Sequence, residues 1–217
     1  MIIVPESAAV LNIIIHTIYN SPCAQNSPKF EELIEAVDKM PLYGLTPNTI
    51  ILPKSPMHDL LLAHGALRPL DIYALAAYHN IPSLAEKVSS HLLGFSLSNI
   101  NDEMACRIGA PYLRRLFLLH TNRLEELKRI LPKPPYIHPA TEDCSFESQA
   151  KLARAWAMGA THLAWEMRPD LSIHTIKSVL ESLKDKLKCT DCQAMLEKRI
   201  HEVLTRWAAV KCTISLE

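Results

Sequence analysis

The stretch Pro69–Leu93, PLDIYALAAYHNIPSLAEKVSSHLL, decides the fold class of this chain. It predicts two short helices joined by a tight turn, because Pro69 and Pro82 stand where the first turn of a helix accepts a proline. The apolar residues that follow each proline recur at three- and four-residue steps, which is the helical period. Helix pairs of this kind make docking surfaces, and we expect this stretch to form one.

The same helical pattern extends through the rest of the 217 residues. Ser55 and Ser172 stand at predicted helix starts, where a hydroxyl can accept a hydrogen bond from a free backbone N–H. Gly44 suits a left-handed helix end, and the run Gly109–Pro111 predicts a break in a helix. No alternating strand pattern of useful length occurs, so we predict an all-α fold.

The least helical stretch is LPKPPYIHPATEDC, which ends at Cys144 and contains four prolines. Such a composition predicts a stiff connection between helical parts. We therefore divide the chain into residues 1–94, connecting helices in 95–131, a Pro-rich linker in 132–144 and a helical subdomain in 145–217.

Composition argues against several partners. The formal net charge is zero, so no electrostatic case exists for nucleic acid. The apolar run Ala8–Ile18 is far shorter than the roughly 20 residues that cross a bilayer, so we expect no membrane partner. No secretory signal is evident, and the six cysteines are irregularly spaced. These features predict reduced thiols in the cytoplasm or nucleus.

Three segments resemble the rear half of a BTB/POZ domain and the helices after it: VLNIIIHTIYN (10–20), FEELIEAVDKMPLYGL (30–45) and LDIYALAAYHNIPSLAEKVSSHLL (70–93). The whole chain is similar to BTB-domain proteins of mushroom-type (basidiomycete) fungi. Those proteins carry R-A-W-A, A-W-x-x-R-P-D-L and C-x-x-C stretches downstream, which here are residues 154–157, 164–171 and 189–192.

The resemblance implies that residues 1–94 are the C-terminal part of a BTB-like domain and that a helical subdomain follows. It implies a non-enzymatic scaffold or adaptor that binds proteins or associates with itself. The strand-and-helix front half of the family domain has no counterpart in this sequence, as in a shortened product or an incomplete gene model. Helices deprived of that sheet would expose an apolar patch, and we expect it at Ile13, Ile14, Ile15 and Ile18.

One group of residues has the chemistry of a metal site. Cys189 and Cys192 have the C-x-x-C spacing that lets two thiolates bind one tetrahedral ion, and they stand at the start of the final helix, whose dipole favours thiolates. Cys144 precedes the long helix, and His138 lies six residues earlier. If the long and last helices pack antiparallel, these four residues meet as a structural zinc site. The alternative is four unrelated residues.

No motif of a known catalytic type occurs, and a redox role for C-x-x-C lacks the βαβ context that it needs. We therefore predict a protein that is not an enzyme and has no cofactor apart from the structural zinc considered above. The alternative function is a helical metal-binding protein, or an uncharacterised enzyme, built around the loops of Cys144, Cys189 and Cys192.

Overall fold

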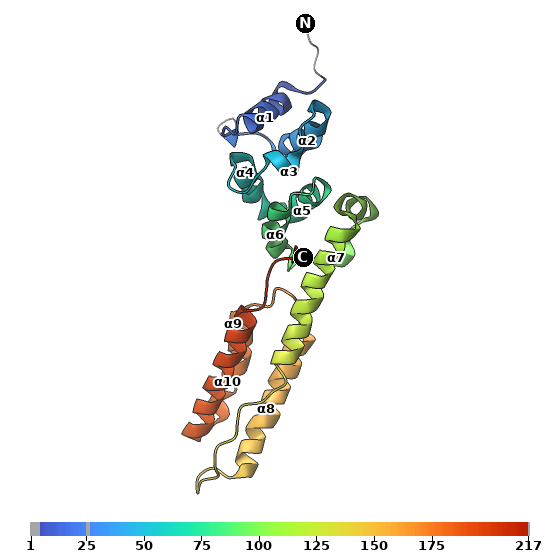
Figure 1. The fold of residues 1–217 in the computed structure, drawn as a ribbon. Coiled ribbons are helices and arrows are strands. Elements are labelled where there is room, and N and C mark those ends of the chain that lie inside the picture. The colour runs from blue at the N-terminus through green and yellow to red at the C-terminus, as the bar shows by residue number, and fades with distance from the viewer. Residues whose placement is uncertain (1–4, 25–26, 217) are drawn as a thin grey trace. The chain divides into compact units, whose positions relative to one another are not determined.

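The computed structural model describes residues 5–24 and 27–216, and it confirms the all-α prediction (Figure 1). Ten α-helices and several short 3₁₀ turns make up the described part, in which no strand forms. Residue contacts divide the chain into two units, one of residues 1–119 and 212–217 and the other of residues 120–211. We call them unit 1 and unit 2 and describe each separately.

Unit 1 holds six whole helices and the first part of a seventh. Their bounds are α1 (Ala8–Ile18), α2 (Phe30–Lys39), α3 (Pro47–Ile50), α4 (Pro56–Gly65), α5 (Pro69–Tyr78), α6 (Pro82–Ser89) and α7 (Asp102–Ile130).

The predicted helix signals act as expected. Ser55 caps α4 by accepting a hydrogen bond from the backbone N–H of His58 at 3.3 Å. Gly44 has a φ of 72°, the left-handed conformation that glycine adopts without steric cost. Gly109 also has a positive φ, 75°, and it interrupts α7 just before Pro111. The break predicted at Gly109–Pro111 is therefore confirmed.

Helix α5 lies at the centre of unit 1 and is not a docking surface. All residues from Ile72 to Ala76 are fully buried, and the helix packs against α4 and α6. The hydroxyl of Tyr73 donates a hydrogen bond to the backbone carbonyl of Tyr112 at 2.8 Å. Our expectation for Pro69–Leu93 was thus wrong for its first helix, because α5 is apolar on every side and so needs neighbours all round.

The structure contradicts half of the apolar patch that we predicted on α1. Ile13 and Ile14 are only 3% and 1% exposed and belong to the core, whereas Ile15 and Ile18 are 44% and 48% exposed. The buried pair shares one helical face with Val10, and that face belongs to the core that α2 also enters. Residues 15 and 18 fall on the other face, as the helical period requires.

Unit 2 begins within α7, ahead of the Pro-rich segment. Its other helices are α8 (Phe146–Trp165), α9 (Ile173–Glu181) and α10 (Thr190–Ala208). Trp156, Leu180 and Leu196 lie in a common core to which Leu131 and Cys144 also belong. Residues 132–144, which we predicted to link two subdomains, lie wholly inside unit 2, and the division by contacts falls between residues 119 and 120.

A carboxylate joins three helices of unit 1. Asp38 of α2 accepts hydrogen bonds from Nε2 of His79, just after α5, at 2.7 Å and from Nη2 of Arg107 in α7 at 2.9 and 2.7 Å. Burial raises the pKa of the Asp38 carboxyl, but the hydrogen bonds from His79 and Arg107 outweigh burial and hold this pKa below its usual range. The ionised carboxylate therefore stabilises unit 1.

We predict that Asp38→Asn lowers the free energy of unfolding by about 1 kcal/mol at neutral pH. Because the folded-state pKa is lowered, the stabilisation is present above the pKa of an unfolded aspartate and is lost as pH falls through the folded value. Urea unfolding at neutral and acidic pH should show the two proteins converging in acid. Asp71→Asn, at the more exposed pair with Arg68, is the control. A gap that persists unchanged in acid would contradict the assignment.

Candidate metal centre

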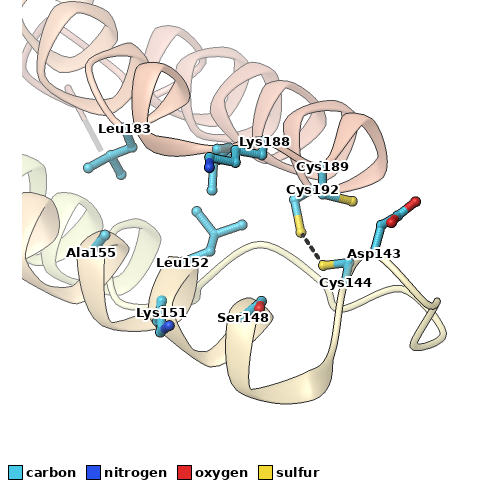
Figure 2. A pocket seen from close by; sticks show the side chains of 11 residues that line it. Asp143, Cys144, Ser148, Lys151, Leu152, Ala155, Leu183, Lys188, Cys189 and Cys192 are labelled. Carbon is cyan, nitrogen blue, oxygen red and sulfur yellow. Dashed lines mark hydrogen bonds between the residues drawn. The ribbon is translucent and has the colours of Figure 1, made fainter.

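Four side chains from three segments of unit 2 meet at one point. Cys144 precedes α8, Cys189 is the N-cap of α10, Cys192 lies in the first turn of α10, and His138 comes from the Pro-rich segment. Their ligand atoms all lie within 4.8 Å of one another, and three of the residues are buried (Figure 2 shows the three cysteines). The structure thus brings together the four residues that the sequence analysis selected, and this group could hold a metal ion.

Buried donors fix the start of the Pro-rich segment. The indole N–H of Trp156 donates to the Leu131 carbonyl at 2.9 Å. Arg199 of α10 donates to the Ile130 carbonyl at 2.7 Å and to the Lys133 carbonyl at 2.9 Å. Carbonyls at a helix end otherwise lack partners. These bonds therefore anchor the chain five residues before His138 to α8 and α10.

His138 is held with Nε2 facing the sulfurs. Its ring Nδ1 lies 2.7 Å from the Pro139 carbonyl, which can only accept, so Nδ1 carries the proton and Nε2 has the free electron pair. Nε2 lies 3.3 Å from Sγ of Cys192 and 3.4 Å from Sγ of Cys189. The Pro139 carbonyl raises the pKa of His138 first, and Cys189 raises it further. A carbonyl on the second ring nitrogen is the usual support of a metal-binding histidine.

A tight turn directs Cys144. Thr141 and Cys144 exchange two backbone hydrogen bonds, of 3.1 and 3.2 Å, across the two residues between them. This turn places Sγ of Cys144 3.6 Å from Sγ of Cys192. Burial raises the pKa of the Cys144 thiol. Gln149 joins α8 to the Pro-rich segment, because its Oε1 accepts a hydrogen bond from the backbone N–H of His138 at 3.1 Å.

The two cysteines of α10 differ in their electrostatics. The backbone N–H groups of Cys192 and Asp191 face the Cys189 sulfur and, with the neighbouring thiols, outweigh burial and lower its pKa. Burial raises the pKa of Cys192 to about 12, and the adjacent sulfurs add to the rise. Cys189 is thus the thiol that ionises most readily. Cys144 and Cys192 need a nearby positive charge to become thiolates at neutral pH.

The spacing of the atoms matches one tetrahedral ion. A zinc ion with Zn–S of about 2.3 Å and Zn–N of about 2.05 Å places its sulfurs about 3.8 Å apart and each sulfur about 3.6 Å from the nitrogen. Three of the six separations, 3.6 Å between the sulfurs of Cys144 and Cys192 and 3.3 and 3.4 Å between the His138 nitrogen and the sulfurs of Cys192 and Cys189, lie close to these values, and all six are within 4.8 Å.

Sequence reasoning missed the residues that support the ligands. Arg199 has the same helical register as the core residues Leu196 and Val203, and only 2% of it is exposed. An arginine at a core position of an amphipathic helix was the available signal, because a buried guanidinium must find acceptors. Gln149 gave no comparable signal in the sequence.

Unit 1 contains a Ser–His–Asp arrangement that the sequence did not indicate. Nε2 of His58 lies 3.4 Å from Oγ of Ser83, and Nδ1 lies 3.3 Å from Oδ1 of Asp59. The His58 side chain is 0% exposed. A nucleophile and its base must both reach the substrate. We therefore interpret His58 as a core histidine that forms hydrogen bonds with its neighbours, and not as a catalytic base.

Comparison with family models, with curated proteins and with solved structures finds no match to this chain. Within the described residues, no helix combines the length and apolar character that crossing a bilayer would take.

We predict that Arg199→Met lowers the free energy of unfolding of unit 2 by about 3 kcal/mol, because it leaves the Ile130 and Lys133 carbonyls without their donor. Thermal unfolding followed by circular dichroism measures the effect. Lys198→Met, on the exposed side of α10, should change stability little. Equal melting temperatures for the two variants would show that Arg199 does not anchor the Pro-rich segment.

Proposed function

We propose that the chain is a non-enzymatic protein-interaction module of the BTB/POZ type that its sequence resembles, and that a structural zinc ion holds its second unit together. The observation that carries the metal proposal is the convergence of His138, Cys144, Cys189 and Cys192 within 4.8 Å. The three segments that carry the resemblance contribute α1, α2, α5 and α6, which share one core in unit 1. This common core supports the interpretation of the three segments as parts of one module.

The ligand set favours a structural ion over a catalytic one. Catalytic zinc has three protein ligands and a water molecule, whereas structural zinc has four protein ligands, often cysteines. Three thiolates and one imidazole would fill a tetrahedral ion, and His138, Cys144 and Cys192 are buried. A filled and buried ion has no position for a substrate.

Electrostatics favours this site for a dication. Three thiolates around Zn²⁺ leave one net negative charge. The N-termini of α8 and α10 both lie at the site, since Cys144 directly precedes the N-cap of α8 and Cys189 caps α10. Helix N-termini stabilise nearby negative charge. Together the ion and the two helix ends offset the cost of ionising buried thiols.

The proposed partner is another protein, including a second copy of this chain. Ile15 and Ile18 lie on the exposed face of α1, and Tyr19 follows directly with most of its ring exposed. Helix α1 contains no Asp, Glu, Lys or Arg. A helix that is apolar on both faces normally packs on both. The six free cysteines fit a reducing compartment, so we place the protein in the cytoplasm or nucleus.

We predict one zinc ion per chain in protein purified without chelators, measured by atomic emission. Removing the ion should lower the melting temperature of unit 2, because a ligand at 1,000 times its dissociation constant stabilises a fold by about 4 kcal/mol. Cys144→Ser and Cys192→Ser should each lose the ion. Cobalt substitution should give visible bands of a tetrahedral site and a thiolate-to-cobalt charge-transfer band.

Cys106→Ser, at an exposed cysteine of unit 1, is the matched control and should keep the full zinc content. Protein that contains no zinc, and whose melting temperature a chelator leaves unchanged, would remove the metal proposal.

We predict that Ile15→Glu with Ile18→Glu abolishes binding through α1 without unfolding the chain, because both side chains already face solvent. Sedimentation velocity over a range of concentrations measures self-association. Leu67→Glu, at an exposed leucine between α4 and α5, is the control and should associate like the unmodified protein. If the unmodified chain stays monomeric at every concentration, a second copy is not the partner.

A further inference from the structure

A cavity of about 440 Å³ opens beside the metal centre (Figure 2). Its volume falls within the roughly 300–1,000 Å³ of small-molecule sites. Leu152 and Ala155 of α8 line one wall, and Leu183 and Leu187 line the other. In Figure 2 the Leu152 and Leu183 side chains point into the space between the two walls. The interior of the cavity therefore offers an aliphatic surface.

Two lysines give the cavity its charge. Lys151 of α8 and Lys188, which precedes α10, both line it from opposite walls (Figure 2). Neither ammonium forms a salt bridge within the part of the chain that the structure describes. Asp143 is the one carboxylate in the lining, and it lies next to Cys144 at the metal end. The lysine side of the cavity is thus cationic.

We propose that this cavity binds an amphipathic carboxylate, a medium-chain aliphatic acid whose chain lies against the four apolar wall residues and whose carboxylate meets Lys151 and Lys188. A bound aliphatic chain removes its own apolar surface from water, against walls in which Leu152 and Leu183 are buried and Ala155 and Leu187 are partly exposed. A carboxylate can accept charge-assisted hydrogen bonds from the ammonium groups of these two exposed lysines. A cationic amphiphile of equal length would place like charges together.

The inference rests on the proposed function in one respect. Cys144, Cys189 and Cys192 form the end wall of the cavity. A bound ion would fix their positions, so binding should be measured on the zinc-loaded full chain. Zinc content and ligand binding are separate readouts, which keeps the two proposals distinguishable.

The experiment titrates decanoate, below its micellar concentration, into zinc-loaded protein in a calorimeter. We expect one site, with decyltrimethylammonium at least tenfold weaker and octanoate about tenfold weaker because it lacks two methylenes. Lys151→Gln with Lys188→Gln should weaken decanoate at least tenfold. Lys128→Gln with Lys198→Gln, which removes the same charge from exposed faces of α7 and α10, should leave binding unchanged.

Ala155→Phe fills the cavity and should abolish binding while thermal unfolding remains cooperative. Equal affinity for decanoate and decyltrimethylammonium, or full decanoate binding by the Lys151/Lys188 variant, would overturn the inference. A chain that carries one zinc and binds no decanoate overturns this inference alone. A chain that takes up no zinc and still binds decanoate overturns the metal proposal alone.

Discussion

Three sulfur atoms and one imidazole nitrogen lie within 4.8 Å of one another in unit 2, and much of the unit is arranged around that constraint. Thiols are weak hydrogen-bond donors and acceptors, so four such groups gain little from each other alone. Burial raises the pKa of both Cys144 and Cys192, which keeps their protons in place unless a positive charge arrives. The Pro139 carbonyl meanwhile fixes the His138 proton on Nδ1 and turns the free electron pair of Nε2 toward the sulfurs. A single dication would accept an electron pair from all four donor atoms at once. A proton on any one of these atoms can be shared with only one or two of the others.

Other side chains of unit 2 position the backbone segments that carry the three cysteines and the histidine. Arg199 and Trp156 bind the carbonyls at the end of α7, so the Pro-rich segment leaves that helix in one direction. Gln149 then fixes the backbone at His138, and the Thr141–Cys144 turn presents the next ligand. Arg199 and Trp156 are buried donors, and Gln149 is a buried acceptor. A buried donor that loses its acceptor pays its full desolvation cost, which makes the path of this segment specific as well as stable.

The ligands were predictable because they depend on short-range signals. Cys189 and Cys192 have a spacing that one ion can bridge, and a helix start adjoins each of Cys144 and Cys189. The helix break at Gly109 and the helix start at Ser55 were equally predictable, since backbone conformation and capping are local properties. The burial of Ile13 and Ile14 was not predictable, because consecutive isoleucines allow either face of α1 to turn inward. The division of the chain inside α7 was also hidden, since a continuous helical period shows no boundary where the partners of a helix change.

The candidate metal site shares residues with the core of unit 2 and with the wall of its cavity. Cys144 and Cys192 are members of the core that includes Leu127, Trp156 and Trp207, and both also line the open cavity. Unit 1 instead has a central helix, α5, that is fully buried from Ile72 to Ala76. Helices α8 and α10 bury one face each, and the candidate metal site lies at their N-terminal ends. A metal ion bound there would join the N-terminal ends of α8 and α10 through its four bonds to these side chains.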